Sequence, residues 1–195
     1  MNRLKLCVLL VSLVVSLPVA AHSSEGVAGG LLSGFLHPLL GPDHLLAMLA
    51  VGLWGTFLPW PAIWVLPVVF PVVMAFGGVL GVLGLPMPGV ELGIAGSAIA
   101  LGMAVALKLK PPLAVVAILV AGFAIFHGHA HGTELPEAAN PVAYSLGFVV
   151  ATGGLHALGI ALGALARWPW GEKVVRGAGA LISLAGLYFL VRALA

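Results

Sequence analysis

Long apolar stretches constrain this chain more than any other feature of its sequence. Proline, glycine or a few polar residues separate the stretches, which run approximately over residues 26–58, 61–85, 89–107, 111–130, 140–166 and 172–194. Of the 195 residues, 62% are apolar and only 7% are charged, so a water-soluble fold could not cover the apolar surface. The sequence therefore predicts an all-α fold, a polytopic transmembrane helical bundle with about six spans.

The N-terminus has the pattern of a secretory signal peptide. A basic start is followed by an apolar run from Leu6 to Val19 and by small residues, so residues 1–21 are predicted to be removed by cleavage before His22. The alternative is an uncleaved first transmembrane helix. Residues 22–195 would then form a single transmembrane domain with its mature N-terminus outside. The one cysteine, Cys7, lies in the signal segment, so a metal site in the mature chain would use nitrogen and oxygen ligands.

The first apolar stretch is too long for one straight crossing. Gly41-Pro42 interrupts it, because proline lacks a backbone donor and biases the preceding residue away from helix. We expect 26–39 to be a partial or re-entrant helix and 43–58 to be the true span. Six crossings from an outside start put the basic loop residues on the cytoplasmic side, as positive-inside topology requires, and predict a bacterial inner-membrane protein. These residues are Lys108, Lys110, Arg167, Lys173 and Arg176.

Two short segments carry most of the ionisable side chains in the apolar stretches. In the first, His37, Asp43 and His44 flank the Gly41-Pro42 break, and broken helices at membrane depth are tolerated where they line a site. The alternative is that Asp43 caps the helix starting at His44 and that both histidines are interfacial. Because an ionisable group inside a membrane is costly, a function is the more natural explanation.

The second segment contains three histidines and a glutamate. On a helix, His127, His131 and Glu134 share one face, whereas His129 projects from roughly the opposite side. Neutral imidazole suits zinc, copper, iron and nickel, and a carboxylate can complete the ligand set. The alternative is a polar helix end at the interface. The spacing predicts a metal-binding face.

Four further residues are weaker candidates for metal handling. Glu91 opens the third span and could instead favour the helix dipole, and Met48, one turn after His44, could simply pack. His156 lies in the middle of a span, where it could be a relay, a metal ligand or a hydrogen-bond partner of a neighbouring helix. After cleavage, His22 would offer its amino group and its imidazole together. The predicted topology places the 37–44 segment, Glu91 and the 127–134 segment near the outer face, as in a capture site or the entry of a path.

The two motifs resemble those of the HupE/UreJ family of nickel transporters. They read His37-Pro-x-x-Gly-x-Asp43-His44 and Phe126-His127-Gly-x-Ala-His131-Gly-x-Glu134, behind a signal peptide and with about six spans. The resemblance implies delivery of Ni²⁺ for hydrogenase or urease maturation, with roles in metal handling for His37, Asp43, His44, Glu91, His127, His131 and Glu134. His129 is an extra histidine and a possible further ligand. The first motif is also similar to the His-x4-Asp-His signature of the nickel/cobalt transporter family, although here five residues separate His37 from Asp43.

Several function classes are disfavoured. The phosphate-binding motif Gly-x-x-x-x-Gly-Lys-Ser/Thr is absent from the sequence, so transport would be passive, ion-coupled or driven by a partner. The sparse, patchy basic residues argue against nucleic-acid binding, and we expect neither an organic cofactor nor an enzyme. Co²⁺ or Zn²⁺ remain alternatives to Ni²⁺ as substrate. The rival interpretations are a membrane-embedded metalloenzyme and a metal-binding or sensing subunit that does not conduct. The lipid bilayer is the expected surrounding, and a homo-oligomer or a metal-delivery partner is left open.

Overall fold

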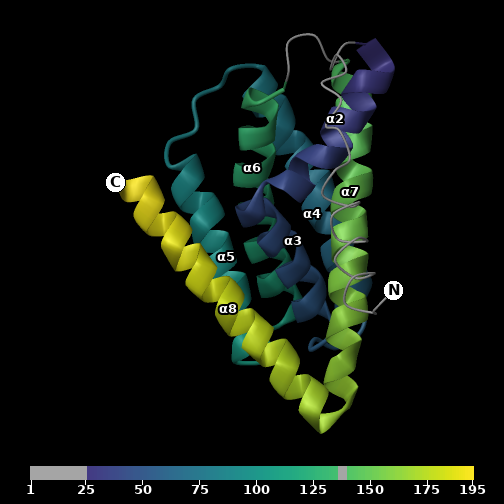
Figure 1. Cartoon of the computed structure of the whole chain (residues 1–195), viewed down its shortest axis with the longest axis vertical. Helices are drawn as coiled ribbons and strands as arrows, with labels where there is room; N and C mark the ends of the chain where they lie inside the picture. Colours follow the sequence, from purple (N-terminus) through teal and green to yellow (C-terminus); the bar gives the residue numbers. More distant parts are fainter. Residues whose placement is uncertain (1–25, 136–139) are drawn as a thin grey trace, which may run out of the picture.

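A computed structural model describes residues 26–135 and 140–195, and every regular element in these two ranges is a helix (Figure 1). This confirms the predicted all-α class. The signal segment, Cys7 and His22 lie outside the described residues. The elements are α2 (Gly26–Leu40), α3 (Pro42–Gly55), α4 (Ala62–Val82), α5 (Val90–Ala106), α6 (Leu113–Thr133), α7 (Pro141–Gly163), the 3-10 turn η1 (Ala164–Arg167) and α8 (Pro169–Leu194).

The helices are those of a multi-pass membrane protein. Four of them, α4, α6, α7 with η1, and α8, are long and apolar enough to cross a bilayer, and α2 with α3 passes the same test as one bent pair. Large apolar side chains point outward from these helices, for example Val72 on α4 and Ile118 on α6, as a lipid-facing surface requires. Helix α5 has 17 residues, roughly 26 Å at 1.5 Å per residue, against a hydrocarbon core of about 30 Å. The count of six spans therefore stays a prediction.

The predicted break at Gly41-Pro42 is present. Helices α2 and α3 meet there at 80°, and Gly41 has the extended backbone that a residue before proline favours (φ −87°, ψ 104°). Each helix alone is too short to cross, at roughly 21–23 Å. Helix α3 ends at Gly55 rather than at the predicted residue 58, before a loop that contains Pro59 and Pro61.

Helix pairing orients the second histidine segment. Helix α4 packs along α6, α5 along α8, and α7 along both α2 and α3 (Figure 1). At the α4–α6 contact, a Cβ on Gly128 would overlap the carbonyl oxygen of Met74, and one on Gly132 would overlap that of Gly78. Glycines four residues apart let helices approach closely in membranes. With its glycine face against α4, α6 turns the neighbouring positions 127 and 131 toward the α2–α3 bend.

Candidate metal centre

Three helix ends converge on one group of imidazoles and carboxylates. The last turn of α2 contributes His37, the first turn of α3 contributes Asp43 and His44, and the last two turns of α6 contribute His127 and His131. Glu134 lies immediately after α6. The 80° bend is what allows the end of α2 and the start of α3 to face the same end of α6.

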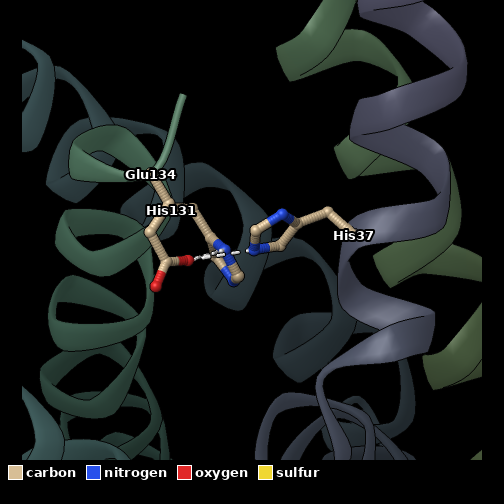
Figure 2. Close-up of side chains that lie close together, drawn as sticks. All are labelled: His37, His131 and Glu134. Carbon is tan, nitrogen blue, oxygen red and sulfur yellow. Dashed lines mark hydrogen bonds and ion pairs between the residues drawn. The ribbon is translucent and has the colours of Figure 1, made fainter. Parts of the chain in front are cut away.

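The outermost part of this group joins α2 to the end of α6 (Figure 2). Nε2 of His37 donates a hydrogen bond to Oε2 of Glu134 at 3.0 Å, and Nδ1 of His131 lies 3.9 Å from the same oxygen. One ligand atom from each of the three residues lies within 4.8 Å of the others. Side chains spaced in this way can share one metal ion.

The carboxylate of this outer group is held in its charged form. The hydrogen bond from His37 keeps the pKa of the Glu134 carboxyl below its ordinary value, and it outweighs the opposite effect of partial burial. About half of the Glu134 side chain is exposed, whereas that of His131 is 5% exposed. The group is therefore open to solvent on its glutamate side and closed on its His131 side.

Further imidazoles continue from His131 into the protein. The ring centroids of His131 and His44 are 4.3 Å apart, and those of His44 and His127 are 5.0 Å apart. The first ring of this order, His37, is partly exposed, whereas His131 and His44 are buried and His127 is fully buried. We call the sequence His37, His131, His44 and His127 the histidine file.

Hydrogen bonds orient the two deeper rings of the file. Oδ1 of Asp43 accepts a hydrogen bond from Nδ1 of His44 at 2.8 Å and one from the backbone N–H of His44 at 2.9 Å. Nδ1 of His127 donates to the carbonyl of Phe123 at 2.9 Å. In both rings Nε2 is buried and has no hydrogen-bond partner among the described residues. A ring held at Nδ1 in this way presents its Nε2 lone pair, the usual arrangement of a metal-binding histidine.

Other predicted site residues lie outside the file. Nε2 of His129 donates to the carbonyl of Leu85 at 2.7 Å, so this ring points away from the file and ties α6 to the α4–α5 loop. Met48 is fully buried in the apolar core. Glu91 is exposed in the first turn of α5 and makes no hydrogen bond or ion pair with another described residue.

His156 lies deeper and is separated from the file by an aromatic ring. The Phe70 centroid is 5.4 Å from that of His127 and 5.4 Å from that of His156. The His156 ring also lies beside the carbonyl of Pro67, which lacks its helical donor because residue 71 is proline. Its two nitrogens make no aligned hydrogen bond among the described residues.

Two aromatic residues beside the file were not predicted from the sequence. Phe148 packs on His131 with centroids 4.1 Å apart, and Tyr144 lies 6.0 Å from His37. Both project from α7, and an apolar cavity of about 420 Å³ between α4, α6 and α7 reaches His131 beside them. An aromatic residue in an apolar helix is ordinary, so no local signal in the sequence distinguishes these two.

Comparisons with known proteins agree with the two motifs. The family model described as HupE / UreJ protein matches residues 9–189. Protein HupE of Rhizobium leguminosarum bv. viciae is 47% identical over 178 residues, which cover 91% of this chain and 93% of that protein. No solved structure matches. A match over nearly the whole length, with both histidine segments inside it, places the chain in the HupE/UreJ family.

Proposed function

We propose that this protein carries Ni²⁺ across the bacterial inner membrane and that the histidine file is the first part of the path. The observation that carries the proposal is the file itself, in which four imidazoles run from a partly exposed position to a fully buried one. An isolated structural metal site would close around one ion, whereas an extended series of ligands offers successive positions. Nitrogen and oxygen ligands suit Ni²⁺, and Co²⁺ and Zn²⁺ are the competing substrates.

Capture would begin at the outer group. The ionised carboxylate of Glu134 attracts the cation, and His37 and His131 replace part of its water shell. His131 also neighbours His44, so it can take part in both the outer and the inner ligand sets. Asp43 and Glu91 belong to this proposal as well, Asp43 by orienting His44 and Glu91 by adding negative charge at the same end of the bundle.

Movement inward would follow the file from its partly exposed end to its fully buried end. Nε2 of His44 and of His127 are the next ligands, and Phe70 stands between His127 and His156. A membrane potential of ~100 mV, negative inside, favours entry of a divalent cation by about 4–5 kcal/mol. Facilitated diffusion would therefore suffice if the glutamate end of the file faces outward.

The test is Ni²⁺ uptake into proteoliposomes that contain only this protein. The variant His37→Ala/His44→Ala should abolish saturable uptake, because it removes one ligand from the outer group and one from the buried part of the file. His129→Gln is the matched control, since it removes a histidine of α6 that points away from the file and can still donate to Leu85. It should retain uptake. Addition of Co²⁺ and Zn²⁺ as competitors measures selectivity.

Two results would overturn transport. Metal binding without flux in the wild-type protein would favour a sensing or delivery subunit, and metal that stays bound through purification together with turnover of a substrate would favour a metalloenzyme. Equal uptake by the double variant and the wild type would contradict the file as the path.

A further inference from the structure

A second cavity lies at the end of the bundle opposite the histidine file. Its volume is about 530 Å³, and it is lined by residues of the end of α3 with the loop to α4, the α5–α6 loop, and the junction of α7 with η1. Three cationic residues line it, namely Lys108, Lys110 and Arg167, and none of the described residues that line it is acidic. The cavity therefore suits an anion.

Charge at this end of the molecule is unbalanced. The described residues there include five basic side chains, those of Lys108, Lys110, Arg167, Lys173 and Arg176, against the single carboxylate of Glu172. That carboxylate is shared, since it lies 2.7 Å from Nζ of Lys108 and 3.7 Å from Nη1 of Arg176. Lys110 and Arg167 form no ion pair with a described residue. Two of the three cations that line the cavity are thus left without a neutralising partner.

The α5–α6 loop is held in place around the cavity. Nε1 of Trp54 donates to the carbonyl of Leu109 at 2.9 Å, and Nε of Arg176 donates to that of Ala106 at 2.8 Å. Lys108 has φ of +54°, in the left-handed region that non-glycine residues rarely adopt. On the other side, the Arg167 guanidinium lies 3.8 Å from the centre of the Trp168 ring. The fold therefore positions the loop that carries Lys108 and Lys110, and Trp168 positions Arg167.

The position of the cavity and the apolar surface beside it suit a bound lipid. Membrane-crossing helices α4, α7 and α8 begin or end here, so the cavity lies at the depth of the headgroups. Trp60 lines the cavity and is 75% exposed, and Trp64 and Leu162 continue an exposed apolar surface along α4 and α7. Tryptophan side chains favour this interface. A free phosphate would use the cations alone, whereas a phospholipid would use both the cations and the apolar surface.

We propose that this cavity binds the phosphate headgroup of an anionic phospholipid, whose acyl chains lie along the outer faces of α4 and α7. Basic pockets between transmembrane helices are a known form of lipid recognition, and Arg and Lys are the natural partners of a phosphate. The bound lipid connects the ends of α3, α5 and α7. The site is separate from the histidine file and does not depend on metal transport.

Native mass spectrometry of the purified full chain tests the proposal. With phosphatidylglycerol and phosphatidylcholine in equal amounts, the wild-type protein should retain phosphatidylglycerol selectively. The variant Lys110→Gln/Arg167→Gln should bind it roughly tenfold or more weakly, because each cation near the membrane surface contributes appreciably. The control Lys173→Gln/Arg192→Gln removes the same charge from exposed positions outside the cavity and should bind like the wild type.

Three outcomes would contradict the lipid site. These are a wild-type protein without selectivity for phosphatidylglycerol, an equal loss in both double variants, and displacement of the lipid by inorganic phosphate at comparable concentration, which would indicate a site for a free anion. The wild-type comparison of the two lipids decides the question even if the cavity variant fails to fold.

Discussion

Hydrogen bonds at single residues decide which nitrogen each deep imidazole can offer. His44 is held at Nδ1 by a carboxylate and His127 by a backbone carbonyl, and in both rings Nε2 is left for a ligand. A carboxylate behind a histidine fixes the ring and also raises its basicity. Asp43 is therefore expected to act on the metal through His44, although the motif alone would list it as a ligand.

Substitution of Asp43 separates orientation from charge. In Asp43→Asn, Oδ1 can still accept the hydrogen bond from Nδ1 of His44, but the negative charge is lost. The Ni²⁺ affinity should therefore fall roughly 10-fold to 100-fold. In Asp43→Ala the hydrogen bond that orients the His44 ring is lost as well, so the Ni²⁺ affinity should fall further. Competition with a coloured chelator measures both. Equal affinities for the two variants would mean that the hydrogen bond to His44 does not matter.

The pH dependence of Ni²⁺ binding should come from the imidazoles and not from Glu134. The pKa of Glu134 is lowered by its partner His37, so the carboxylate stays ionised as the pH falls, and its contribution is lost only below the usual carboxylate range. Neutral imidazole is the binding form of histidine, so affinity should decrease from pH 7 to pH 5. Glu134→Gln should weaken Ni²⁺ binding at every pH between 7 and 5 without changing how steeply the affinity depends on pH. Binding or uptake that rises toward pH 5 would contradict this ligand set.

At the scale of helices, two features bring the file together. Pro42 bends the first apolar segment so that His37 and His44 face α6, and the glycine face of α6 allows close contact with α4. His127 and His131 occupy positions next to those glycines, so the packing of α6 on α4 fixes the direction of both rings. A small change in the α4–α6 contact should therefore reach the metal site.

Alanine at Gly128 tests this coupling. The new Cβ would overlap the carbonyl of Met74, so α6 must move away from α4, and we expect a loss of about 1–3 kcal/mol in stability together with weaker Ni²⁺ binding. Gly122→Ala on the same helix meets no atom within 4 Å and should be neutral. Thermal unfolding in detergent compares the two variants. Similar melting temperatures for both would argue against a tight α4–α6 contact.

At the scale of the whole molecule, the ionisable groups are divided between the two ends of the bundle. The end of α6 and the start of α5, which carry part of the histidine file and Glu91, lie at one end, and the α5–α6 loop and η1, which carry Lys108 and Arg167, lie at the other (Figure 1). Positive loops favour the cytoplasmic side. The file should therefore open to the outside, where it can receive an ion that the membrane potential drives inward.

Cysteine labelling tests this orientation. In a Cys7→Ser background, Pro88→Cys in the α4–α5 loop should react with a membrane-impermeant maleimide on intact cells with a permeable outer membrane. Lys173→Cys at the basic end should react only after the inner membrane is opened. The reverse pattern would invert the proposed direction of transport.

Local features of the sequence determined a large part of this protein. Apolar stretches predict the helical bundle because a bilayer requires internally bonded backbone. The Gly41-Pro42 pair predicts the bend because proline limits both its own position and the preceding one. Helical periodicity puts His127 and His131 on one face and His129 on another.

The packing of the helices sets which of these groups meet. His37 and Glu134 are 97 positions apart in sequence and form a hydrogen bond, whereas His129, close in sequence to file residues, turns away from the file, and Met48 is packed in the apolar core. His156 is isolated behind Phe70, a residue with no polar signature. Periodicity and proline act within one helix, but the neighbours of a side chain across helices depend on which faces pack together. That choice rests on contacts such as the glycines of α6 against α4, and such contacts form only when the whole bundle assembles.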